Sequence, residues 1–472
     1  MGASSLSALP TDPTVIHGEA DLCQSDSAHL MITASDRTIL NYQSFNVGQG
    51  ESVQFIQPNA KSTVLNRVVG GDPSQILGKL NANGRLFLVN PHGIYIGPSG
   101  SVNVGSFIAS TLSIKDEDFA NGSYRFFSES GEGTIVNEGT ISAGLDGGVA
   151  LLSSMIQNRG SIVAKADRIV LAAGERVALD FTGDGLMQFS VDGELEKALI
   201  ENYGDIEAAD GSVELSVRAA RQAVKMVLNT DGIETASGIE KQGGEIRLVS
   251  GSHIAAKNVC VDGDGNVEVS GCIEGKTVHV LGDYVDLQGA AIDASGKNGG
   301  GEVLIGGDYQ GKGLVRNAVM TAVDENSTIY ADALTMGDGG KVIVWADATA
   351  VFDGTIFARG GKEGGNGGFV ETSGKINLGV TKGTVNTSAP KGQFGEWLMD
   401  PSSVNIITSG SASLATVANC LDITGTYTIA PATINAAMSP VTVCATGGAG
   451  TITVTNAVAM SVSGVSLTLT GS

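Results

Sequence analysis

The chain has 472 residues and a formal net charge of −22. This acidity argues against nucleic acid as a partner, because phosphate neutralisation needs clustered Lys and Arg, and against electrostatic docking to anionic membranes. Glycine, at 67 residues, has about twice its usual share while proline is scarce, which excludes collagen and proline-rich disorder. With 42% hydrophobic but only 5% aromatic residues, the composition predicts a large core of layered aliphatic side chains.

The first part of the chain contains short alternating runs. Residues 29–33, 38–42 and 52–56 alternate apolar and polar side chains, which predicts strands. Residues 72–78 begin with Asp72 and Pro73, a cap followed by a residue that favours the first helical position. We therefore expect a single helical turn there.

In the next stretch, short predicted strands alternate with tight turns. Residues 85–89, 94–96 and 102–104 are predicted as strands, because each is short, apolar and bounded by turn residues. The turn Asn90-Pro91-His92-Gly93 has type I chemistry, with Asn first, Pro second and Gly last. No helix fits between these turns.

This stretch carries a family resemblance. Residues 90–105, NPHGIYIGPSGSVNVG, are followed after Ser106 by FIASTL, and the whole run resembles the signature of the secretion domain of two-partner secretion exoproteins, the filamentous haemagglutinin family. The motif match singles out Asn90, Pro91, Gly93 and Ile94 as residues of the signature turn or of partner recognition. The family's early Asn-Pro-Asn-Leu motif is absent, so no docking role is transferred to that region.

The resemblance implies a fold and a function. The expected fold is all-β, a right-handed parallel β-helix with an N-terminal cap and a β-hairpin excursion. The expected function is that of a secreted, non-enzymatic, adhesin-like exoprotein without a cofactor. Its N-terminal domain would be recognised, while unfolded, by periplasmic domains of an outer-membrane β-barrel transporter. Further expectations are a host-cell surface or a glycan as target, a monomeric chain, and a location at the cell surface or outside the cell.

An internal repeat supports this fold. Asn-x-Gly-x-Ile recurs from Asn137, Asn158 and Asn202, and glycine pairs precede aliphatic runs at 243–248, 300–305 and 339–344. The pattern predicts coils of about 20–24 residues whose strands stack on one another, about twenty coils in all, in a rod on the order of 100 Å long.

Several segments depart from the repeat. Residues 115–133 are predicted as a surface loop or excursion, residues 177–181 and 186–191 as a β-hairpin, and residues 194–200 as a short helix. The expected organisation is a secretion domain over residues 1–240, a β-helix shaft over 241–400, and a Ser/Thr-rich region over 401–472 that ends as a truncated rod. The first residues resemble the start of a mature exoprotein whose leader has been removed.

An enzymatic alternative is an extracellular β-helix polysaccharide lyase or hydrolase, since glycosidases need two facing carboxylates. Asp283 with Asp286, and Glu194 with Glu196, are the candidate pairs. With 50 acidic residues in the chain, such pairs are also expected on any solvated face. A cleft lined by carboxylates and Lys or Arg would favour the enzyme, and a plain polar face the adhesin.

Metal binding has little support in the sequence. The five histidines (His17, His29, His92, His253 and His279) and five cysteines (Cys23, Cys260, Cys272, Cys420 and Cys444) show no ligand spacing typical of a metal site. Residues 262–266, DGDGN, resemble a calcium loop but lack its glycine and glutamate. Cys420 and Cys444 lie 24 residues apart, about one coil, so they are candidates for stacking or for a disulfide.

Overall fold

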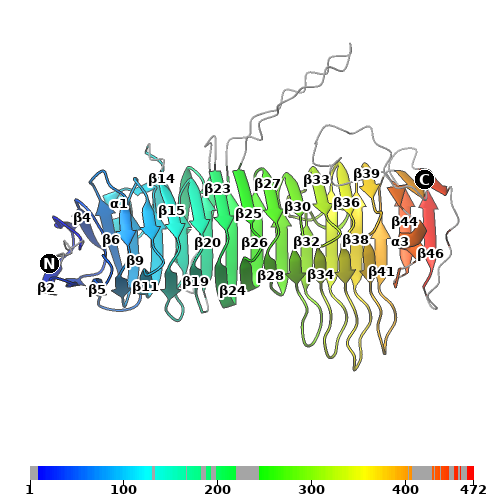
Figure 1. Cartoon of the computed structure of the whole chain (residues 1–472), viewed down its shortest axis with the longest axis horizontal. Helices are drawn as coiled ribbons and strands as arrows, with labels where there is room; N and C mark the ends of the chain where they lie inside the picture. Colours follow the sequence, from blue (N-terminus) through cyan, green and yellow to red (C-terminus); the bar gives the residue numbers. More distant parts are fainter. Residues whose placement is uncertain are drawn as a thin grey trace, which may run out of the picture.

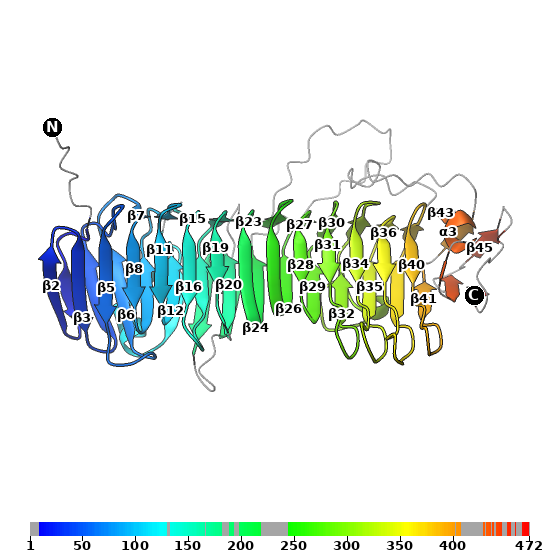
Figure 2. The same cartoon turned by 60° about the horizontal axis from the view of Figure 1, so that its bottom comes forward.

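The computed structural model describes residues 9–129, 133–165, 167–181, 188–192, 198–218, 244–401 and parts of 403–471. These residues form one long rod in which strands lie side by side across its axis from the N-terminus to the C-terminus (Figures 1 and 2). Successive coils pair in parallel, for example Val303 with Val342 and Val342 with Val370. The expected parallel β-helix is confirmed.

The rod has three faces. The first is a separate sheet of short strands: β7 (Ser74–Ile76), β10 (Ile94–Ile96), β15 (Thr134–Asn137), β18 (Met155–Asn158), β23 (Ala198–Asn202), β25 (Gly244–Leu248), β27 (Asn266–Val269), β30 (Tyr284–Leu287), β33 (Met320–Val323), β36 (Thr349–Phe352) and β39 (Asn377–Gly379).

The second face follows a tight corner in each coil. Its strands are β2 (Ala20–Asp26), β3 (His29–Ala34), β5 (Ser52–Ile56), β8 (Lys79–Ala82), β11 (Ser101–Val104), β16 (Thr140–Ala143), β19 (Ser161–Val163), the first parts of β24 (Asp205–Val217) and β26 (His253–Gly263), β28 (Cys272–Glu274), β31 (Ala291–Asp293), β34 (Thr328–Tyr330), β37 (Thr355–Phe357) and β40 (Thr384–Asn386).

The third face completes the coil. It contains β1 (Thr14–His17), β4 (Thr38–Tyr42), β6 (Thr63–Val68), β9 (Arg85–Val89), β12 (Ser106–Ser110), β17 (Val149–Leu152), β20 (Arg168–Ala173), the second parts of β24 and β26, β29 (Thr277–Leu281), β32 (Glu302–Ile305), β35 (Lys341–Ala346), β38 (Phe369–Gly374), β41 (Glu396–Met399), β44 (Val441–Ala445) and β46 (Leu467–Gly471).

Smaller elements surround these faces. A satellite sheet of β13 (Ser113–Ile114), β14 (Tyr124–Phe127), β21 (Arg176–Asp180) and β22 (Gln188–Asp192) lies beside helix α1 (Asp116–Ala120). Near the C-terminal end are β42 (Ser403–Ile406), β43 (Thr428–Ile429), β45 (Thr451–Val454) and helix α3 (Pro431–Asn435), and a one-turn helix η1 (Tyr309–Gly311) lies over the third face. None of the helices among the described residues has the length and apolarity needed to cross a membrane.

The core is a continuous column of aliphatic side chains. Alternate residues of each strand point inward and stack on equivalent residues of the next coil, as Ile292 does on Ile329. Both Val303 and Val342 are fully buried. Because every inward position repeats, the column excludes water along the described length of the rod.

Two N-terminal pairings confirm the expected cap. The β1–β4 and β2–β3 pairs are antiparallel, whereas β3 and β4 then pair in parallel with the first coils. The β-hairpin excursion is also confirmed, because β21 and β22 pair antiparallel.

Three local predictions were wrong. Residues 74–76 form strand β7 rather than a helical turn, because they pair with β10 of the next coil. Residues 198–200 belong to β23 rather than to a helix, and residues 193–197 lie outside the described residues. Coil length is also not constant: Ile273 stacks on Ile292 after 19 residues, but Ile292 stacks on Ile329 after 37. Because of the long turns, the described residues form fewer than the expected twenty coils.

Buried asparagines join three coils of the first face. The amide of Asn137 donates to Oδ1 of Asn158 at 2.8 Å, and the amide of Asn158 donates to Oδ1 of Asn202 at 2.7 Å. All three side chains are fully buried. Each amide satisfies the next, which a buried polar group requires.

Replacing Asn158 by Ala should therefore destabilise the rod by about 2–4 kcal/mol, because it leaves polar atoms of Asn137 and Asn202 buried without partners. Denaturant unfolding followed by circular dichroism measures this loss. Gln157→Ala, at the adjacent half-buried position, is the matched control and should cost about 1 kcal/mol or less. Equal losses of stability in the two variants would contradict a structural role for the row of hydrogen-bonded asparagines.

Candidate functional site

The signature turn connects β9 to β10 and is fixed by the side chain of Asn90. This side chain is fully buried, and its amide donates to the carbonyl oxygen of Asp72 and to Oγ of Ser74, both at 3.0 Å. Its Oδ1 accepts a hydrogen bond from the backbone N–H of His92 at 3.0 Å. Asn90 therefore closes its own turn and ties it to the preceding coil.

Gly93 meets the next coil. Its φ of +119° lies in a region that residues with a Cβ rarely adopt, and a Cβ there would lie 3.1 Å from the carbonyl oxygen of Thr134. Its backbone N–H donates to the carbonyl of Asn90 at 3.1 Å, and its own carbonyl accepts from the N–H of Ser74 at 3.0 Å. Both conformation and space therefore require glycine.

The remaining signature residues follow the same pattern. Ile94 is 1% exposed and stands in β10 between Ser74 of β7 and Ile135 of β15. Pro91 is half-buried, and His92 is the exposed residue of the turn. Of the four residues predicted from the motif, three are therefore buried in the folded domain.

The outer side of β9 is buried as well, which the alternation of Leu86 to Val89 did not reveal. Phe87 points away from the main core and packs edge-on against Phe119 of α1, with ring centroids 5.2 Å apart. Residues 115–133, predicted as a loop or excursion, supply α1 and β14 to this second core. Arg67 connects it to the rod through Asp116 at 2.5 Å and the carbonyl of Ile114 at 2.6 Å.

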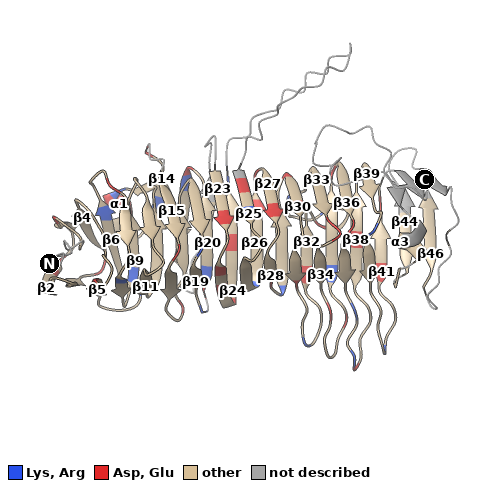
Figure 3. Cartoon of the chain, in the orientation of Figure 1, with Lys and Arg blue, Asp and Glu red and all other residues tan. Residues whose placement is uncertain are grey.

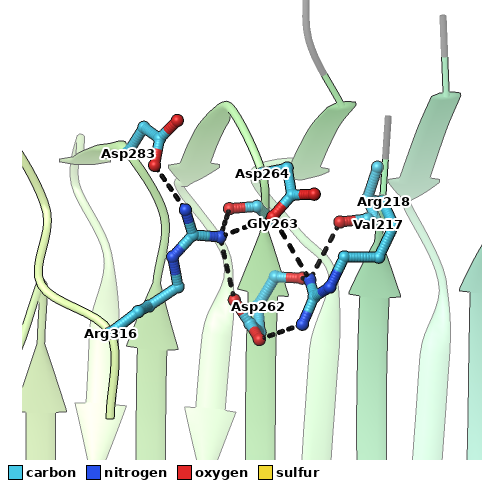
Figure 4. A network of polar contacts seen from close by, with 7 residues as sticks. All are labelled: Val217, Arg218, Asp262, Gly263, Asp264, Asp283 and Arg316. Carbon is cyan, nitrogen blue, oxygen red and sulfur yellow. Dashed lines mark hydrogen bonds and ion pairs between the residues drawn. The ribbon is translucent and has the colours of Figure 1, made fainter. Parts of the chain in front are cut away.

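In residues 262–266, the segment that only partly resembles a calcium loop, arginines contact the carboxylates and leave no open ligand set. Arg316 contacts Asp264 at 2.9 Å and also reaches Asp283, while Arg218 contacts Asp262 at 2.5 Å (Figure 4). Guanidinium groups therefore already neutralise these carboxylates. Asp283, one member of a candidate catalytic pair, is part of the same network; Glu194 and Glu196, the other pair, lie outside the described residues.

An open groove of about 840 Å³ lies at the beginning of the third-face strands, next to the long turns that lead into them. Its lining includes the charged residues Glu302, Lys341 and Glu396. Phe369 also lines the groove. Lys341 contacts Glu302 at 3.3 Å and Asp308 at 2.5 Å. Figure 3 shows charged residues of both signs in these turns. The groove is therefore lined by both acidic and basic side chains, rather than by uncharged polar groups or by charges of one sign.

The one-turn helix η1 lies over the third face, where the ring of Tyr309 packs edge-on against Phe369. The backbone N–H of Gln310 donates to Oε2 of Glu371 at 3.1 Å, and its amide donates to Asp400 at 2.8 Å. Glu371 is fully buried and its Oε1 has no hydrogen-bond partner. The pKa of Glu371 is raised to about 7, chiefly by burial. The hydrogen bonds from Gln310 and Ser373 lower the pKa, and the nearby charges of Asp400 and Asp308 add smaller upward contributions.

Substitutions in the signature turn should destabilise the fold. Asn90→Ala should cost about 2–4 kcal/mol, because it leaves the buried Oγ of Ser74 and the carbonyl oxygen of Asp72 without their donor. Gly93→Ala should cost on the order of 2 kcal/mol through backbone strain. Denaturant midpoints measure both effects. His92→Ala, exposed in the same turn, is the control and should change stability by about 0.5 kcal/mol or less.

Glu371 should make stability depend on pH. The pKa of an unfolded glutamate is 4.5 and that of folded Glu371 is about 7, so its contribution to stability is present below pH 4.5 and is lost as the pH rises to about 7. Glu371→Gln removes this loss. The variant should equal the wild type near pH 4.5 and exceed it at pH 8 by on the order of 2–3 kcal/mol, as thermal melts will show.

Exposed Glu396→Gln, on the neighbouring strand, is the control and should show no such difference between the two pH values. A Glu371→Gln variant whose advantage is the same at pH 4.5 and pH 8 would contradict the buried, protonated state of Glu371.

Comparisons with known proteins agree with this geometry. A family model described as the TPS secretion domain matches residues 18–269, more than half of the chain. The crystal structure of the HMW1 secretion domain from Haemophilus influenzae superposes with a TM-score of 0.66 and 30% identity, covering 83% of this chain and 100% of that one.

Two curated relatives, both named heme/hemopexin-binding protein from Haemophilus influenzae, are 28% and 25% identical over 251 and 255 residues. These matches cover 51% and 50% of this chain but only 27% and 26% of the relatives, so the chain spans about a quarter of their length. The chain belongs to the TPS secretion domain family, the exported domains of two-partner secretion exoproteins, which pass through the outer membrane to the cell surface or the medium.

Proposed function

We propose that residues 1–240 are a secretion domain that the periplasmic domains of an outer-membrane transporter recognise before it folds. The family match carries this proposal, since it begins at residue 18 and includes the whole signature turn. The match continues to residue 269, into the first coils of the proposed 241–400 shaft. Residues 401–472 would continue the rod as a separate Ser/Thr-rich region.

The burial of the signature turn explains why recognition would precede folding. Asn90, Gly93 and Ile94 are buried between coils, so a partner that reads them has to meet the chain while they are still exposed. After the chain has crossed the outer membrane, the same residues would stabilise the folded turn. Because each coil contacts mainly its neighbours, folding can then proceed coil by coil from the emerging N-terminal end.

The folded rod would act as a monomeric, adhesin-like support outside the cell. The curated relatives are named for binding heme and hemopexin, which supports a binding role rather than catalysis. The groove on the third face, with Phe369 between Lys341 and Glu396, is the surface most suited to a glycan or a host-cell ligand. A lyase or hydrolase is not favoured, because Glu302 is paired with Lys341 there and Asp283 with Arg316.

An export assay tests recognition at the signature turn. In cells that produce the cognate transporter, Asn90→Ala should lower the amount of secreted chain about tenfold or more, because it removes a motif residue as well as a structural contact. His92→Ala should be secreted normally. The secreted fraction is measured by immunoblotting of the medium and the periplasm.

The control for stability is Asn158→Ala, which removes a buried asparagine of the same kind outside the motif. If both asparagine variants lose secretion equally, stability rather than recognition explains the loss, and if Asn90→Ala is secreted normally, the signature turn has no part in export.

A further inference from the structure

Three potential metal ligands of different chemistry meet on the outer surface of the second face. His253 stands at the start of β26, and Cys272 and Glu274 stand on β28 of the next coil. His253 stacks directly on Cys272, and Ala255 on Glu274. One ligand atom from each of the three side chains lies within 4.8 Å of the other two.

The separation of the ligands fits a small tetrahedral site. Nε2 of His253 lies 3.4 Å from Oε1 of Glu274. Two nitrogen or oxygen ligands at about 2.0–2.1 Å from a tetrahedral Zn²⁺ ion are about 3.3 Å apart, so this pair already has the required spacing. The thiol of Cys272 is the third ligand atom, within 4.8 Å of the other two.

Among the described residues, Nε2 of the imidazole has no hydrogen bond and the thiol forms no disulfide. Nε2 of His253 is buried and has no hydrogen bond. Cys272 is a half-buried free cysteine. A buried nitrogen without a partner is costly, and a metal ion would satisfy it.

The surroundings favour a cation. Asp205 stacks beside His253 on the preceding coil, and Asp293 stacks beside Glu274 on the following one. Both carboxylates are exposed, and Figure 3 marks positions of Asp and Glu in red along β24. Together with Glu274 they give this part of the face a negative potential that attracts a divalent ion.

We propose that His253, Cys272 and Glu274 bind one Zn²⁺ ion. A thiolate, an imidazole and a carboxylate form a ligand set typical of zinc, and a hard cation such as Ca²⁺ would not select the sulfur. Three protein ligands leave the fourth position for water. Because the ligands come from two successive coils, the ion would clamp these coils where the family match ends and the shaft begins.

A zinc titration of the full chain tests the site. The reduced, metal-free protein is titrated with Zn²⁺ in competition with a chromophoric chelator, and the expected result is one ion per chain. Cys272→Ser and His253→Ala should each weaken this binding at least tenfold, and Glu274→Gln should weaken it less. Titration with Co²⁺ should give a thiolate-to-metal charge-transfer band that Cys272→Ser abolishes.

Cys260→Ser is the matched control, because Cys260 is a half-buried free cysteine on the same strand as His253. It should bind zinc as the wild type does. Circular dichroism checks that every variant folds, and the exposed Glu274 provides a variant that leaves the core untouched. No stoichiometric binding, or binding that Cys272→Ser leaves unchanged, would overturn the proposal and leave only adventitious binding to an acidic surface.

Discussion

The parallel, in-register stacking of equivalent residues on successive coils is the constraint on which the structure depends. Each strand is short, and a single coil cannot bury its own apolar side chains. Stacking converts these small surfaces into one continuous dry column, in which Val303 lies on Val342 and Val342 on Val370. A polar side chain is accommodated in this column when its hydrogen bonds are made by the stacked residues of neighbouring coils. Asn137, Asn158 and Asn202 form such a row.

The same constraint bears on the two roles that we propose for the signature turn, recognition and folding. In the folded chain the turn lies between coils, where Asn90 holds the preceding coil and Gly93 allows the next to approach. Residues that a transporter would read in the unfolded chain are therefore the residues that folding removes from view. Under the proposed function, recognition and folding are mutually exclusive states of this segment, which suits recognition on one side of a membrane and folding on the other.

Stacking also assembles sites from residues that are far apart in sequence. One coil of 19 residues brings His253 onto Cys272, and an excursion of 54 residues between Asp262 and Arg316 still ends in contact. Function on such a rod therefore depends on columns across coils rather than on short motifs. The groove of the third face follows the same rule, since Glu302, Lys341 and Phe369 occupy one column of three successive coils.

The sequence alone determined the fold class, the hairpin excursion and the signature turn, because periodic aliphatic residues and turn chemistry are local signals. It did not reveal the strand at Ser74–Ile76, where pairing with β10 overrides a local capping pattern, or the second core around Phe87. Nor could it show that Asp262 and Asp264 contact arginines, or that His253 and Cys272 meet. Only the tertiary structure decided these features, because the distance along the chain between stacked residues varies from 18, between Val267 and Val285, to 48, between Ile206 and Ile254. This variation sets which distant side chains share a column.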